Sequence, residues 1–224
     1  MKRCLLLWVL LESMPAGAPA AVVPDAKAAT NYYVLSSAAA QTNLVKLRRM
    51  ANPVTYKQLG FSATNEPAAA SNGVPLLVYE ATLARLREYK NEPDYANLVE
   101  PTVRIIYPVL IGGEARCSHT LRLMADGSWQ GELWGEPQLI KRLVAARAVI
   151  APVSTNWLEA PFAVDVPVAG IWLVGYREPT GRLRLISTTD LKLGKETMKK
   201  NTEISPAVMT EISKLAQRYK IGSN

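Results

Sequence analysis

One stretch of this sequence, residues 102–134, constrains the fold more than any other, because apolar residues alternate there and glycine-bearing turns recur. Alternation in the first segment involves Val103, Ile105, Tyr107, Val109 and Ile111. Such alternation is typical of a strand with one buried face. Gly112-Gly113 and Asp126-Gly127 are typical hairpin turns, and residues 116–124 and 128–134 continue the pattern. The sequence therefore predicts a three-stranded antiparallel meander. Pro108 lacks an N–H for the sheet, so we expect an edge strand or a bulge there.

Periodicity and breakers predict the remaining elements. We expect helices at 38–50, 76–90, 137–150 and 205–220, a loop at 60–74 and further strands within 162–189. Residues 21–37 show no period and suggest an extended lead-in. The expected organisation is an N-terminal extension at 21–74 and an α+β domain at 75–224, in which helices pack on antiparallel meanders. A repeated Pro-Val pair suggests two αβββ-like sub-units at 75–135 and 136–224; one continuous sheet is the alternative.

The order of helix, meander, helix and second hairpin resembles that of cystatin-like and PepSY-type exported modules. The resemblance covers about residues 75–189 and lies in the element order. It implies an α+β fold, and we transfer no functional residue from it.

The first 20 residues have the pattern of a cleavable signal peptide. Met1-Lys2-Arg3 is basic, residues 4–11 are apolar but too short to span a bilayer, and Ala18-Pro19-Ala20 fits a cleavage site. We therefore expect export, with a bacterial periplasm or the cell exterior as the compartment. No later apolar stretch reaches transmembrane length, so we expect no membrane-spanning segment in the mature chain.

Cys117 and His119 are the one cysteine and the one histidine that remain after cleavage. They are two residues apart in a predicted strand, so both side chains project from one face. They are the only candidates for a nucleophile–base pair, and a buried structural role is the alternative. The sequence contains no phosphate-binding loop and no His/Cys cluster, so we expect neither a cofactor nor a metal site.

Positive charge is concentrated near the C-terminus. Removing Lys2, Arg3 and Glu12 leaves 24 basic and 18 acidic residues of the original 26 and 19. Ten basic and five acidic residues lie from Arg177 onward. Arg182 and Arg184 alternate with leucines, which predicts that both guanidinium groups face solvent. With Arg177 they form a candidate patch for an anionic envelope component, and export makes nucleic acid an unsuitable partner.

Two tryptophans occur in the third predicted strand, Trp129 and Trp134. Their odd separation predicts that they face opposite sides of the sheet. One would then lie in the core and the other at the surface, where it could anchor a partner.

These observations favour an exported, non-catalytic module for binding, inhibition or envelope assembly, whose partner is a protein or an anionic envelope component. The expected binding residues are Trp129, Trp134, Arg177, Arg182 and Arg184. The alternative is an exported hydrolase whose site is assembled from residues distant in the sequence, with Cys117 and His119 as candidates.

Overall fold

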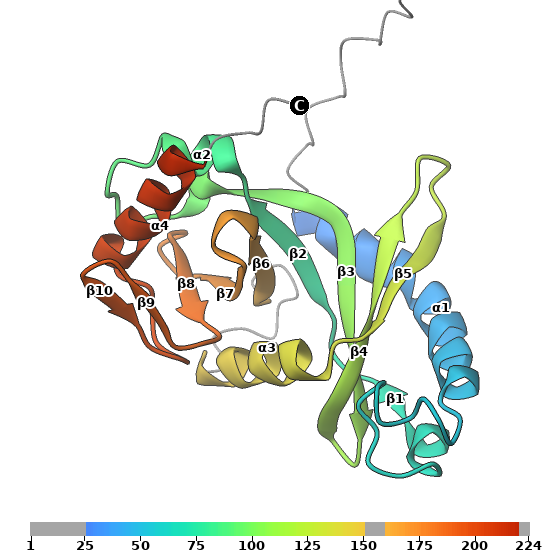
Figure 1. Cartoon of the computed structure of the whole chain (residues 1–224). Helices are drawn as coiled ribbons and strands as arrows, with labels where there is room; N and C mark the ends of the chain where they lie inside the picture. Colours follow the sequence, from blue (N-terminus) through green and yellow to red (C-terminus); the bar gives the residue numbers. More distant parts are fainter. Residues whose placement is uncertain (1–25, 151–159, 220–224) are drawn as a thin grey trace, which may run out of the picture.

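A computed structural model describes residues 26–150 and 160–219 of the chain. Its main sheet is eight-stranded, in the order β5-β4-β3-β2-β6-β7-β8, with β1 also pairing with β3 (Figure 1). The strands are β1 (Ser71–Asn72), β2 (Leu76–Ala81), β3 (Val99–Ile111), β4 (Glu114–Leu123), β5 (Trp129–Gly135), β6 (Phe162–Val166), β7 (Ile171–Arg177) and β8 (Leu183–Ser187). The helices are α1 (Ala26–Met50), α2 (Leu83–Arg87), α3 (Pro137–Val149) and α4 (Pro206–Arg218). A separate hairpin consists of β9 (Leu191–Leu193) and β10 (Glu196–Met198).

Two antiparallel meanders make up the main sheet. Strands β2 to β5 form the first, strands β6 to β8 form the second, and β2 and β6 join them in parallel. The predicted α+β class is confirmed, as are the hairpins within 102–134 and the helices near 137–150 and 205–220. Strands of both suggested sub-units belong to one sheet, and cystatin-like or PepSY-like units are not confirmed. The predicted leader, residues 1–20, lies outside the described residues.

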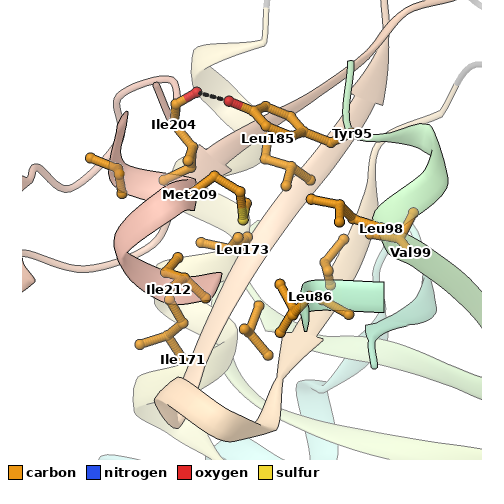
Figure 2. Close-up of a cluster of buried hydrophobic side chains, with 14 of the residues drawn as sticks. Leu86, Tyr95, Leu98, Val99, Ile171, Leu173, Leu185, Ile204, Met209 and Ile212 are labelled. Carbon is orange, nitrogen blue, oxygen red and sulfur yellow. Dashed lines mark hydrogen bonds between the residues drawn. The ribbon is translucent and has the colours of Figure 1, made fainter. Parts of the chain in front are cut away.

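The helices divide the sheet into three buried regions. On one face, α3 packs over apolar residues such as Val78, Ala163 and Val174. On the other face, α1 covers β3 and β4 near Tyr107 and Leu121. On that same face, α4 and α2 cover β6, β7 and β8, and Figure 2 shows this apolar cluster. We call these last two regions the α1 half and the α4 half.

The helix predicted over 76–90 is wrong. Residues 76–81 form β2, and only Leu83–Arg87 is helical. Strand β2 lies between β3 and β6 and is covered on both faces, so its apolar residues form a nearly continuous run without alternation. The Thr82 hydroxyl then accepts a hydrogen bond from the Arg85 N–H and starts the short helix.

Two further corrections concern the N-terminal extension and Pro108. Helix α1 already begins at Ala26, so the extended lead-in is wrong for 26–37. Its buried stripe contains Ser36 and its exposed side contains Leu35, which hides the helical period. Pro108 is not on an edge strand, because β3 lies between β2 and β4. Its carbonyl accepts from the Gly73 N–H, so its imide nitrogen faces the break between β1 and β2. The nearby bulge is in β4, where Arg116 is the extra residue opposite Val109 and Leu110.

Candidate functional site

Four of the seven predicted site residues lie together beneath α1. Cys117 and His119 project from β4, and Trp129 and Trp134 project from β5, all toward the same helix. The buried stripe of α1 that faces them consists of Ser36, Ala40, Asn43, Leu44 and Leu47. The helical spacing of these residues, which include small and polar ones, is the sequence signal that could have shown where α1 packs on β4 and β5.

A chain of polar and aromatic contacts centres on His119. The Ser36 and Tyr107 hydroxyls are 2.8 Å apart, and the Tyr107 and His119 rings stack with centroids 5.4 Å apart. His119 Nε2 lies 2.8 Å from Asn72 Oδ1. Burial lowers the pKa of His119 from its ordinary 6.5 to about 4. The imidazole is therefore neutral at physiological pH, and it donates from Nε2 to the amide oxygen.

Cys117 and His119 make no hydrogen bond to each other among the described contacts. The Cys117 side chain is fully buried among apolar residues that include Leu44, Leu47 and Val109. Burial raises the pKa of the Cys117 thiol to about 12, so the nucleophilic thiolate is not available near neutral pH. His119 hydrogen-bonds to Asn72 instead. Burial and these contacts favour the structural alternative, and a catalytic role for either residue stays a prediction.

The tryptophans face the same side of the sheet, so the prediction of opposite faces is wrong. A bulge at Glu132 shifts the register between β4 and β5: Leu121 pairs with Gly131, whereas Thr120 pairs with Leu133. The extra residue restores a common orientation for Trp129 and Trp134. Both side chains are half-buried, and the rings of Trp129 and of Tyr32 from α1 are perpendicular, with their centroids 5.7 Å apart.

The two edges of the sheet differ. At β8, the outer backbone is hydrogen-bonded by other segments: Ile204 N–H donates to Leu185 O at 2.8 Å and Ser187 N–H to Thr202 O at 2.9 Å. At β5, the backbone hydrogen-bonds only to β4 within the part of the chain that the structure describes. One edge is therefore closed and the other is available to an added strand.

Apolar and basic side chains surround the β5 edge. Tyr32 contacts Trp129, and Asn43 lies against Gly131, which shows which side of α1 overlies β5. By helical spacing, the same side of α1 carries Leu35, Ala39, Lys46 and Met50. The side chain of Leu35 is 66% exposed, and Leu133, on the opposite face of β5, is 49% exposed. Figure 1 shows α1 passing behind the edge formed by β4 and β5.

The three predicted arginines do not form one free patch. Arg184 is held by Glu178 at 3.0 Å and by Glu203 at 3.2 Å, so its charge is neutralised. The hydrogen bond to Glu178 also raises the pKa of Arg184 above its ordinary value. Arg177 donates to Gly181 O, and Arg182 is exposed without an ion pair to any described residue. Arg182 and Arg184 alternate with the buried Leu183 and Leu185 as expected, but the Arg184 side chain is only 20% exposed and is paired with two carboxylates.

No match to this chain is found among protein-family models, curated proteins or solved structures. None of the helices described here combines the length and apolarity that a membrane crossing requires. Within residues 26–150 and 160–219, no three His, Cys, Asp or Glu side chains are grouped as metal ligands. Fold and side-chain geometry are therefore the basis for any functional proposal.

Proposed function

We propose that this chain is an exported, non-catalytic binding module that captures an extended segment of a partner protein at the β5 edge. The single observation that supports this most directly is the contrast between the hydrogen-bonded β8 edge and the unpaired β5 edge. An extended peptide added to β5 gains main-chain hydrogen bonds, and its alternate side chains contact the two faces of the sheet.

The surroundings of β5 define the partner segment. On the α1 face, alternate side chains of the partner lie near Leu35 and Met50; on the opposite face they lie near Leu133. Apolar side chains suit both positions. Helix α1 contains no acidic residue, and Lys46 and Arg49 are exposed, so acidic residues in the partner are favoured at that end.

A second copy of this chain fits the edge less well. Pairing of two β5 strands in a register centred on the bulge places the extra residue Glu132 of both strands at the same point and interrupts the ladder there. A bulge on an edge strand limits edge-to-edge association of identical chains. A partner strand without a bulge avoids this double interruption.

Selection of linear peptides from a random displayed library on the full chain tests the proposal. We expect the selected peptides to be extended, apolar at alternate positions and acidic, and to slow amide exchange in β5. Leu133→Asp should weaken their binding at least tenfold. Val54→Asp, which changes an exposed apolar residue outside the sheet, should have no effect.

Lys46→Glu should weaken the binding of the acidic peptides and reduce the loss of binding that added salt causes, because the attraction that salt screens is removed. The proposal fails if the peptides bind Leu133→Asp as well as wild type or leave β5 exchange unchanged. It also fails if concentration-dependent dimerisation through β5 accounts for the slowed exchange.

A further inference from the structure

A second surface, at the C-terminal end of α1, combines exposed apolar side chains with positive charge. It consists of six exposed residues, Val45, Lys46, Arg49, Met50, Val54 and Lys57, and we call it the α1-end surface. The first four share one side of the last two helical turns, because residues three and four apart are neighbours on a helix. Val45 is 41% exposed and Met50 is 43% exposed. Figure 1 shows this end of α1 on the side of the molecule away from α4.

The turn that follows α1 is anchored, so Val54 protrudes at a defined place. Asn52 Oδ1 accepts hydrogen bonds from the Val54 N–H at 2.8 Å and from the Thr55 N–H at 3.2 Å. A few residues later, Leu59 and Phe61 are buried in the apolar cluster beneath α1 and hold the turn against it. The Val54 side chain is nevertheless 80% exposed. Apolar side chains that are exposed together and bordered by charged residues are typical of a protein or membrane interaction site.

The charge of this region has a single sign. Residues 26–65 include five basic residues and no acidic one. Three of the five, Lys46, Arg49 and Lys57, are exposed and make no ion pair with any described residue. One exposed acidic residue, Glu136, is close in the fold, because the chain beside it approaches the turn after α1. The surface therefore keeps an excess of positive charge and favours an anionic partner.

We propose that the α1-end surface binds a bilayer that contains anionic lipids. Its apolar side chains enter the boundary between headgroups and acyl chains, and its three cations contact lipid phosphates, so both contributions add to the affinity. The long lysine and arginine stems let the charges stay at the headgroup level. A second copy of the chain suits this surface poorly, because it would bring six like charges together. The inference goes beyond the proposed function and does not rest on it, since the β5 edge binds a strand and this surface lies at a helix end.

Flotation of the full chain with vesicles tests this proposal, using phosphatidylcholine alone and phosphatidylcholine mixed with phosphatidylglycerol. We expect binding to the anionic vesicles to be about tenfold tighter or more, and to weaken as salt is added. Val54→Asp and Lys57→Glu should each weaken it by about fivefold or more. Lys195→Glu makes the same charge change in the turn between β9 and β10, and it should preserve most of the binding. All three variants change exposed side chains, so the fold should be retained.

Equal binding to both kinds of vesicle would overturn the proposal. Undiminished binding by Val54→Asp and Lys57→Glu would also overturn it, and binding through the apolar residues 4–11 would give that result. Equal losses in Lys57→Glu and Lys195→Glu would assign the attraction to net charge instead of this surface. Leu133→Asp separates the two proposals, because it should weaken peptide binding at β5 and leave vesicle binding intact, whereas Val54→Asp should do the reverse.

Discussion

The two halves of the sheet face that α1 and α4 cover differ in how their buried polar groups are satisfied. Among the described residues, eight buried side-chain nitrogen or oxygen atoms make no hydrogen bond. Seven belong to the α1 half: Asn43 Oδ1, Arg48 Nε, Asn72 Nδ2, Arg116 Nε, His119 Nδ1, Trp129 Nε1 and Trp134 Nε1. The eighth is Asn201 Oδ1, close to β8.

In the α4 half, both the buried tyrosine hydroxyl and the outer backbone groups of β8 have hydrogen-bond partners. Its core consists mainly of aliphatic residues, and the Tyr95 hydroxyl within it donates to Ile204 O at 2.8 Å (Figure 2). A buried polar atom without a partner costs about 1–3 kcal/mol. The α1 half is therefore the less stable cover, and it is also the half with the unpaired strand edge. The β5 edge that we propose as the binding site therefore belongs to the half with the less stable cover.

The largest expected effect comes from truncating a buried leucine, and a comparison of one leucine in each half separates global from local unfolding. Leu173 and Leu47 are both fully buried leucines, in β7 under α4 and in α1 respectively. Leu173→Ala should lower the free energy of unfolding by about 2–5 kcal/mol, because it leaves a cavity in the closed core. Leu47→Ala should lower the free energy of global unfolding by a smaller amount, and it should speed amide exchange within α1. Urea denaturation and hydrogen exchange measure the two effects. Equal global losses would remove the distinction between the halves.

The second prediction concerns pH and the single histidine of the chain. The pKa of His119 is 6.5 when unfolded and about 4 when folded, so the unfolded state binds more protons between these values. Its contribution to stability is present above pH 6.5 and is lost as the pH falls toward 4. Between pH 7 and pH 5 the loss should be about 2 kcal/mol. Urea denaturation at both values should show this loss in wild type but not in His119→Gln. Parallel losses in both proteins would assign the effect to other groups.

The regions that local sequence pattern predicts are those whose neighbours lie next to them in the chain. The meander of residues 102–134 is of this kind, since alternation and glycine turns determine both strands and pairing. The local pattern predicts a helix where β2 lies, because the elements that cover this strand, β6 and α3, come more than 50 residues later. The shared orientation of Trp129 and Trp134 depends on one bulged residue, Glu132, which no periodicity reveals.

The candidate sites show the same limit. The strand period alone puts Cys117 and His119 on one face of β4, but their burial depends on α1. Ser36 and Asn72, which complete the polar contacts of that face, are 83 and 47 positions from His119 in the numbering. Contacts between distant segments therefore define these sites.

The smallest expected effect comes from removing a buried tyrosine hydroxyl, and each half of the sheet face contains one. Tyr95 donates to the backbone oxygen of Ile204, whereas Tyr107 pairs with the Ser36 hydroxyl at the same distance of 2.8 Å. Tyr95→Phe leaves a buried carbonyl without its partner and should cost about 1–2 kcal/mol of unfolding free energy. Tyr107→Phe should cost less, because the Ser36 hydroxyl also donates to Tyr33 O. Urea denaturation of both variants measures the difference. A larger loss for Tyr107→Phe would show that the α1 half depends on its polar contacts, and the assignment of stability to the α4 half would then be wrong.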